Sequence, residues 1–200
     1  MSAKPPRLLL KWLKRVAMLA ACSLLVQATA PQGWYVAGSK PADYEAGTDA
    51  QASYNAHPSA YLKSKKSEID GFGTLMQDFR ADKYAGKRVR FSAFARTEAV
   101  ADWAGLWMRI DKGPNMLEFD NMQGRPLKGT LGWRKYEVVL DVPQDATGIY
   151  FGVLLSGTGT VWINSAKFET VGPDVPTTNK GTSAQRDAPA NLNFENGPEE

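Results

Sequence analysis

Short runs in which apolar and polar residues alternate recur along most of the chain after residue 31, and Gly, Pro, Asp and Asn interrupt them. A period of two is typical of β-strands that have one buried and one exposed face. The stretches 88–96 and 135–142 alternate in this way, whereas 148–155 is apolar on both faces and predicts a central strand. Further strands are predicted at 34–38, 43–47, 59–64, 72–79, 116–121 and 160–171.

These runs predict an all-β fold. No long amphipathic helix is indicated after residue 31, and only 79–88 suits a short helical turn or a loop. About nine or ten short strands separated by turns favour a two-sheet antiparallel β-sandwich of the jelly-roll kind. We assign this sandwich to residues 31–171, a length that supports one domain with its own core.

The stretch "WAGLWMRID" at 103–111 has two interpretations. A helix would place its two tryptophans, four residues apart, on one face. A strand would instead turn Leu106 and Met108 toward the core and Trp107 and Arg109 away from it. The strand is favoured, because the segment lies between strong strands and "DKGP" ends it after eight or nine residues.

The N-terminus has the layout of an export signal. Residues 1–15 contain five basic residues and no acidic one, an uncharged apolar run follows at 16–26, and small residues lead up to 30. The run is too short for a membrane span of about 20 residues. We therefore predict a signal peptide at 1–30 and a periplasmic or secreted protein without a membrane span. A buried helix, a retained anchor and a lipoprotein acylated at Cys22 are the competing interpretations.

The charge balance and the cysteine content argue against a nucleic-acid partner and against disulfides. The chain has 24 basic and 21 acidic residues, but five basic residues lie in the predicted signal, which leaves 19 against 21. The apparent basicity therefore belongs to the signal, and we predict no nucleic-acid partner. Cys22 is the only cysteine, so no disulfide stabilises the predicted mature chain.

Residues that carry catalysis are scarce. His57 is the only histidine and precedes a proline in a predicted surface loop, so neither a serine–histidine triad nor a histidine-rich zinc site is indicated. No glycine-rich phosphate-binding motif occurs. Acidic residues are common, yet none stand out as the pair that a glycosidase needs. We predict no enzyme activity, no metal ion and no cofactor.

Binding suits the sequence better than catalysis. Sugar rings stack on aromatic side chains, and their hydroxyls bond to charged and amide groups. Trp133 and Trp162 are expected to pack within the fold, and Arg90 and Arg96 to be solvated. The candidate ligand-binding residues are Trp107, Arg109, Asp120, Asn121, Gln123, Arg125, Gln77, Trp34 and Tyr35.

Several segments resemble a known superfold. "GKRVRFSAFART" and "WRKYEVVLDVPQDATGIYFGVLLSGTGTVWINSAKFE" are similar to the later strands of carbohydrate-binding-module-like jelly rolls, the galactose-binding-like superfold. "GFGTLMQDF", "WAGLWMR", "FDNMQGRPLKGT" and "DVPTT" resemble a little-characterised bacterial domain that is also found attached to helix-turn-helix transcription regulators. The resemblance covers roughly residues 33–178. It implies the fold strongly and the ligand weakly, because one superfold carries many functions.

The chain departs from that pattern in two places. Related modules usually begin with an "NLxFE" strand, which here occurs at 191–195, so the resemblance implies a circular permutation in which this strand returns to the sandwich. Residues 172–190 would then form a linker, with 191–200 as the strand and tail; a disordered tail is the alternative. Related modules also often bind calcium through acidic residues where this chain has Asn164 and Ser165, and with Glu195 these could form at most a reduced site.

Taken together, the sequence predicts an exported, non-catalytic β-sandwich that binds a carbohydrate or another small polar ligand through one sheet face. The alternative is an interaction or sensing module with a protein partner in the cell envelope. A glycoside-active enzyme is the third and weakest hypothesis. A sugar site requires exposed aromatic rings among polar residues, whereas a protein interface requires a broader apolar patch.

Overall fold

The computed structural model describes residues 29–179. Nearly all of the predicted signal peptide, 1–28, and the predicted strand at 191–195 lie outside this range. The described elements are β1 (Tyr35–Gly38), the short 3-10 helix η1 (Pro41–Asp43), β2 (Tyr44–Tyr54), β3 (His57–Ser64), β4 (Phe72–Arg80), β5 (Arg88–Lys112), β6 (Asn115–Asp120), β7 (Leu127–Asp141), β8 (Gly148–Ser156) and β9 (Thr160–Val171). Each strand predicted within residues 29–179 is present, and the all-β prediction is confirmed.

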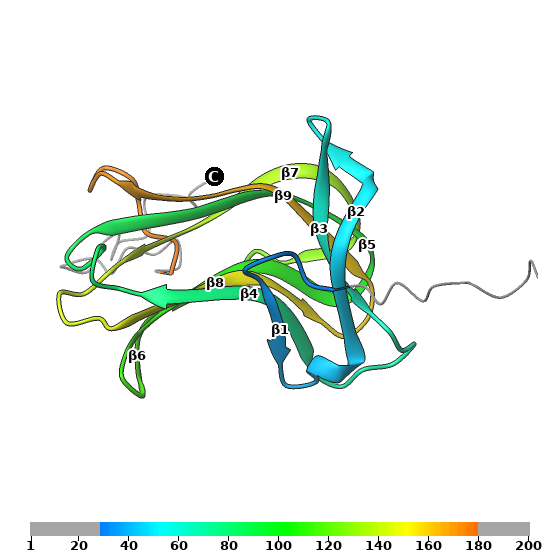
Figure 1. Ribbon diagram of the computed structural model, residues 1–200, viewed down its shortest axis with the longest axis horizontal. Coiled ribbons are helices and arrows are strands. Elements are labelled where there is room, and N and C mark those ends of the chain that lie inside the picture. The colour runs from blue at the N-terminus through cyan, green and yellow to red at the C-terminus, as the bar shows by residue number, and fades with distance from the viewer. Residues whose placement is uncertain (1–28, 180–200) are drawn as a thin grey trace, which may run out of the picture.

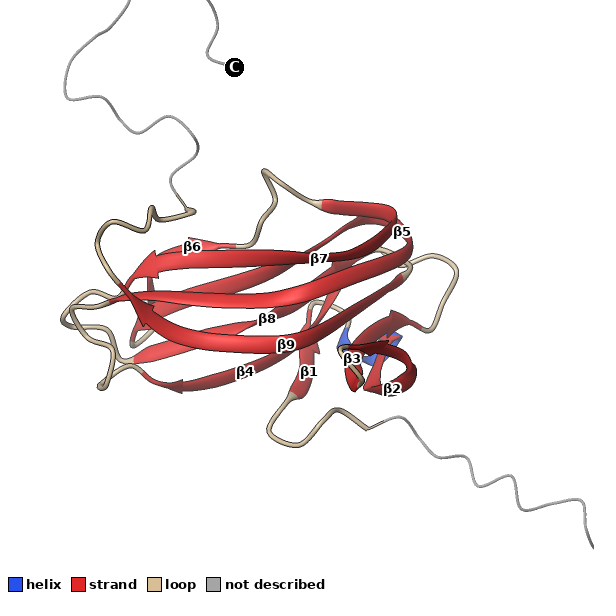
Figure 2. Ribbon diagram, turned by 90° about the horizontal axis from the view of Figure 1, so that it is seen from above, coloured by secondary structure: helices blue, strands red, loops and turns tan. Residues whose placement is uncertain are grey.

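β5 joins two antiparallel layers (Figure 1). Its first half pairs with β7 and β9, and its second half pairs with β8 and β6. One layer, called here the β8 sheet, has the order β1-β4-β8-β5-β6; the other, the β9 sheet, has the order β7-β5-β9-β3-β2. In Figure 2 the strands β7, β5 and β9 of one layer and β8 and β4 of the other run in nearly the same direction along the molecule. The two-sheet sandwich is thus confirmed.

The sequence predicted two strands where the structure has the single 25-residue strand β5. Its pairing with β7 shifts register three times between Ala95 and Ala104, and Ala99 has a positive φ of 50°. Such bulges bend and twist a strand without ending it. β5 therefore passes from one sheet to the other, and the stretch 103–111 is a strand, as predicted.

The core fills the space between the sheets. Leu106, Met108 and Ile110 are at most 1% exposed, which confirms their predicted inward orientation. From the other sheet, Val89 and Phe91 are fully buried against them in the same cluster. Alternation along β5 therefore assigns one face of each half to the core, as the period of two predicted.

The chain after β9 is attached to β5 and β7. The Arg88 guanidinium makes a two-pronged ion pair with Asp141 and also donates to the carbonyl oxygens of Pro173 and Val175. Thr178 exchanges hydrogen bonds with the backbone of Val139. Residues 172–179, which the sequence analysis placed in a linker, thus run along the outer edge of β7.

Tyr44 fixes the start of β2 from inside the core. Its side chain is buried, and its hydroxyl lies 2.8 Å from the carbonyl oxygen of Gly157 and 3.2 Å from that of Gly71. Gly73 lies beneath the ring, where an added Cβ would approach the ring carbons to 2.5 Å. Burial raises the pKa of Tyr44 to about 12, because the phenolate would lose its hydration.

We expect Tyr44 to make folding stability fall in alkali. Below pH 10 the side chain is protonated in both states, so its contribution is complete; between pH 10 and 12 the unfolded chain ionises first and the contribution is lost. Two pKa units correspond to roughly 2.7 kcal/mol. Urea denaturation at pH 8 and pH 11.5 should therefore show that the stability difference between the wild type and Tyr44→Phe shrinks at high pH. A difference that stays constant would contradict this.

Candidate functional site

A row of polar and aromatic side chains crosses the outer face of the β8 sheet. Strand register places Asp78 of β4 opposite Tyr150 of β8, Tyr150 opposite Arg109 of β5, and Arg109 opposite Phe119 of β6. These positions alternate with Met108 and Ile110, which are in the core, so the row lies on the opposite face. Tyr35 of β1 completes what we call the surface row: Tyr35, Asp78, Tyr150, Arg109 and Phe119.

One end of the surface row is an exposed hydrogen-bonded pair. The Tyr35 hydroxyl donates to Oδ1 of Asp78 over 2.5 Å, and Tyr35 is 42% exposed. Partial burial, the hydrogen bond to Asp78 and the negative charge of that carboxylate raise the pKa of Tyr35 to about 12. The phenol is therefore neutral at physiological pH, and the carboxylate keeps acceptor capacity for hydroxyl groups.

The middle of the row carries a cation above an aromatic ring. The guanidinium carbon of Arg109 lies 4.8 Å from the ring centroid of Tyr150, and Nη2 lies 2.9 Å from Oδ2 of Asp111. Asp111 is buried, and its Oδ1 has no hydrogen-bond partner among the described residues. The carboxylate of Asp111 compensates the positive charge of Arg109. The remaining charge in the surface row is the carboxylate of Asp78, so the row is slightly negative.

Trp107 lies on this outer face, as predicted, but it does not form an open stacking platform. It is only 7% exposed and packs with Met76 and Leu154 in a cluster separate from the main core. Its Nε1 donates to Oγ1 of Thr74 on β4 over 2.7 Å. Because β8 lies between β5 and β4, the indole must cross β8, where Gly152 stands opposite Trp107 and has no side chain.

Four predicted binding residues instead order the loop after β6. Arg125 forms an ion pair with the buried Asp120 over 2.7 Å and donates to the carbonyl oxygen of Glu137. The Asn121 side chain accepts a hydrogen bond from the backbone of Gln123. These bonds use Asp120 and Arg125 within the fold, and the four residues are not part of the surface row.

Trp34 and Gln77 lie on the other side of the β8 sheet. Trp34 packs against the core, with its ring 5.8 Å from that of Phe151 in an edge-to-face arrangement. Gln77 is paired with Phe151, so it alternates with the outward Asp78. Of the nine predicted residues, the structure brings only Tyr35 and Arg109 into the row. Asp78, Tyr150 and Phe119 were not predicted as site residues, although each follows the alternation of its own strand.

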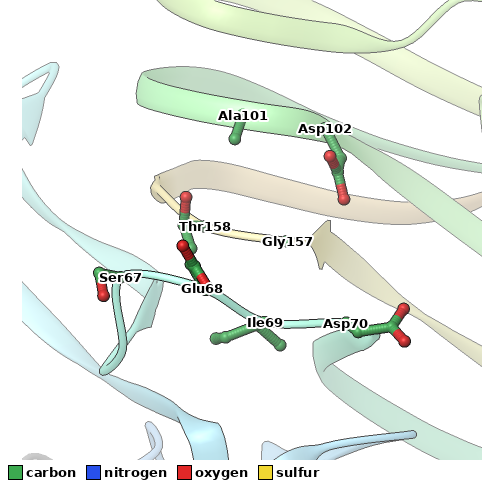
Figure 3. Close-up of a pocket in the computed structure, with 8 residues that line it drawn as sticks. All are labelled: Ser67, Glu68, Ile69, Asp70, Ala101, Asp102, Gly157 and Thr158. Atoms are coloured by element: carbon green, nitrogen blue, oxygen red, sulfur yellow. The ribbon is translucent and has the colours of Figure 1, made fainter.

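A depression on a different part of the surface is acidic. Glu68, Asp70 and Asp102 line it together with Thr158 (Figure 3). Within residues 29–179, no three His, Cys, Asp or Glu side chains are arranged to hold a metal ion. At the position considered for calcium, the Asn164 amide donates to the carbonyl oxygens of His57 and Pro58 and accepts from Ser165, while Glu195 lies outside the described range. His57 is exposed at the start of β3 rather than in a loop.

Comparison with known proteins finds a similar transcriptional regulator but no matching family model. The chain is 45% identical over 167 residues to the uncharacterized HTH-type transcriptional regulator YbfP of Bacillus subtilis, a match that covers 82% of this chain and 57% of that protein. The chain thus spans little more than half the length of this relative.

Solved structures with the same fold include carbohydrate-binding modules. A xylan-binding domain from family 22 is 16% identical, covering 70% of this chain and 88% of its own, with a TM-score of 0.51. The C-terminal family 22 module of Clostridium thermocellum Xyn10B is 14% identical, covering 74% and 91%, with a TM-score of 0.50. The resemblance to carbohydrate-binding modules and to a regulator-associated domain is confirmed, and this likeness concerns the fold. No helix in the described part is long and apolar enough to cross a membrane.

Proposed function

We propose that the protein is an exported, non-catalytic carbohydrate-binding module whose site is the surface row. The observation that carries the proposal is the alignment of Tyr35, Asp78, Tyr150 and Arg109 across four adjacent strands. Export rests on the sequence of residues 1–30, with acylation of Cys22 as the alternative. The carbohydrate-binding modules that share the fold support the ligand class.

The chemistry of the row matches a sugar chain. Tyr35 and Phe119, at its two ends, are exposed aromatic rings that suit the apolar faces of sugars. Asp78 supplies a charged acceptor and Arg109 a charged donor for hydroxyls between them. The row spans five strands, which at about 4.8 Å per spacing is roughly 19 Å. This length suits an oligosaccharide rather than a single sugar.

The exposed apolar residues favour a sugar over a protein partner. Tyr35, Met116 and Phe119 are the large hydrophobic side chains that stand exposed in the described part of the chain. They belong to β1 and β6, at opposite edges of the β8 sheet, with polar residues between them. A protein interface would require a broader continuous apolar patch. An envelope protein therefore remains the second candidate.

Removal of the row's outer rings should weaken glycan binding without unfolding the domain. A screen of neutral oligosaccharides of increasing length identifies a ligand, which is then titrated by calorimetry. We expect Tyr35→Ala and Phe119→Ala each to weaken binding by about tenfold or more, because aromatic contacts dominate such sites. Tyr35→Phe removes only the hydroxyl and should have a smaller effect.

Met116→Ala is the matched control for Phe119→Ala, since Met116 is an exposed apolar residue of the same strand outside the row. Melting temperatures of all variants should stay close to that of the wild type. Variants that bind like the wild type would exclude the surface row as the site. Absence of binding to any glycan, together with capture of an envelope protein, would favour the alternative.

A further inference from the structure

A second group of aromatic rings lies on the outer face of the other layer, the β9 sheet. Tyr54, at the end of β2, stacks on Phe94 of β5 with ring centroids 4.3 Å apart and planes 27° apart. Trp133 of β7 lies 5.4 Å from Tyr54. Phe94 alternates with Ala93 and Ala95, which are in the core, so these rings face outward. We call Tyr54, Phe94 and Trp133 the β9-sheet cluster.

Not every ring on this face is open. Trp162 is 8% exposed; the Arg96 guanidinium carbon lies 4.4 Å from its ring centroid, and its Nε1 donates to Asp49 over 2.9 Å. That hydrogen bond lowers the pKa of Asp49 and holds β2 against β9. Phe94 is covered by Tyr54. The half-buried rings of Tyr54 and Trp133 therefore provide the open aromatic surface.

Basic side chains border the cluster. Lys135 stands directly across from Phe94, is exposed, and makes no ion pair with another described residue. Arg96 lies 6.0 Å from the Trp133 ring, and its carboxylate partner Glu98 is 3.6 Å away and 61% exposed. Glu98 and Asp49 both lie close enough to Arg96 to offset its charge, so Lys135 is the cation at the cluster that has no ion-pair partner among the described residues. The surface row on the opposite face instead has the carboxylate of Asp78 without a paired cation.

We propose that the β9-sheet cluster is a second ligand site, distinct from the surface row, and that it binds a saccharide whose ring bears a carboxylate, such as a uronic acid. The ring of the sugar lies on Tyr54 and Trp133, which offer their open faces. The carboxylate pairs with Lys135, and Arg96 beside the Trp133 ring supplies a second donor, since its ion pair with Glu98 is long, at 3.6 Å, and exposed. The module therefore has two faces of opposite charge preference.

The β9-sheet cluster also has a structural role, because it contacts the β2–β3 hairpin, and this role must be separated from ligand binding. Stacking of Tyr54 on Phe94 holds the β2–β3 hairpin to the sheet, so truncation of either ring would also loosen the fold. Lys135 has no such role, because its ammonium group contacts no described partner. Lys135→Glu therefore reverses the charge at the site while the packing of the rings is retained.

The test is a titration of the intact protein with oligogalacturonate at low and at high salt. We expect Lys135→Glu and Trp133→Ala to weaken binding by about tenfold or more, a loss that corresponds to 1.4 kcal/mol or more. Lys128→Glu changes another exposed lysine of β7 and should leave binding unchanged, as should Tyr35→Ala in the surface row. Binding to oligogalacturonate should also weaken as salt rises.

The proposal is overturned if the intact protein does not bind oligogalacturonate at low salt, or if Lys135→Glu and Lys128→Glu weaken that binding equally. It is also overturned if an acidic peptide displaces the oligogalacturonate and binds more tightly. Loss of oligogalacturonate binding in Tyr35→Ala would move the site to the surface row. Because neutral glycans report on the surface row separately, failure here leaves that proposal standing.

Discussion

Replacement of Trp107 by alanine should destabilise the domain by about 3–5 kcal/mol, as much as truncation of a large core residue. The indole is 7% exposed, packs with Met76 and Leu154, and crosses β8 above Gly152. Truncation would leave a cavity on the outer face and would leave the Thr74 hydroxyl without its donor. Urea denaturation of the variant, with Leu106→Ala as the comparison from the main core, measures this loss.

Two conservative variants separate packing from hydrogen bonding at this position. Trp107→Phe keeps most of the apolar contact but loses the donor to Thr74, and Thr74→Val removes the acceptor while it keeps the shape. Each should cost about 1–2 kcal/mol, well below the alanine variant. If Trp107→Ala is as stable as the wild type, the indole is dispensable to the fold, and a role in ligand binding regains support.

The alternation of apolar residues predicted the strands because each strand has one face in the core and one face that is less tightly packed. Leu106 and Met108 could be assigned to the core from their period of two, and they are buried. The continuity of β5 could not be predicted, since the segment 97–100 contains no residue that marks a bulge rather than a turn. The distinction depends on β7 and β9, which pair with β5 on either side.

Alternation gives the face of a residue but not its exposure. The sequence correctly placed Trp107 on the face of β5 opposite to that of Leu106. The burial of its indole, however, depends on Gly152 and Thr74, which lie 45 and 33 residues away in the sequence. Only the strand order β4-β8-β5 brings Gly152, which has no side chain, and the hydroxyl of Thr74 under the indole.

The surface row was only partly predictable for a similar reason. Arg109 was identified because it alternates with core residues within one strand, and Tyr35 because its strand, predicted at 34–38, was expected near the same rim. Asp78 and Tyr150 join them through the register of β8 with its two neighbours. A single sequence does not encode that register in any local pattern, so residues from separate strands could not be grouped into one site.

Two strand edges on the same side of the sandwich lack a partner among the described residues. β9 pairs with β3 only through Thr160–Ile163, which leaves its later part, Ser165–Val171, open on that side. β4 pairs with β1 only through Gly73–Met76, which leaves Gln77–Arg80 open. Between them the rings of Phe79 and Phe168 meet at 5.1 Å. Open edges flanking an aromatic contact suit one further strand.

Deletion of residues 188–200 should therefore lower the unfolding midpoint by on the order of 10 °C. We propose that 191–195 pairs with one of these edges and turns Leu192 and Phe194 toward the core. Burial of the two side chains would contribute roughly 1.5–3 kcal/mol each. From Asn179, eleven residues of chain at about 3.3 Å each reach roughly 36 Å, enough to cross the five strands of either sheet.

The alternation within this segment supplies the control. Leu192→Asp with Phe194→Asp should destabilise the full chain nearly as much as the deletion, because both changes place charges in an apolar site. Asn193→Asp introduces the same charge on the outward side and should leave the midpoint nearly unchanged. Equal midpoints for the wild type, the deletion and the double variant would show that the segment adds nothing to the folded domain. Equal losses for Asn193→Asp and the double variant would show that charge, rather than burial of Leu192 and Phe194, determines the effect.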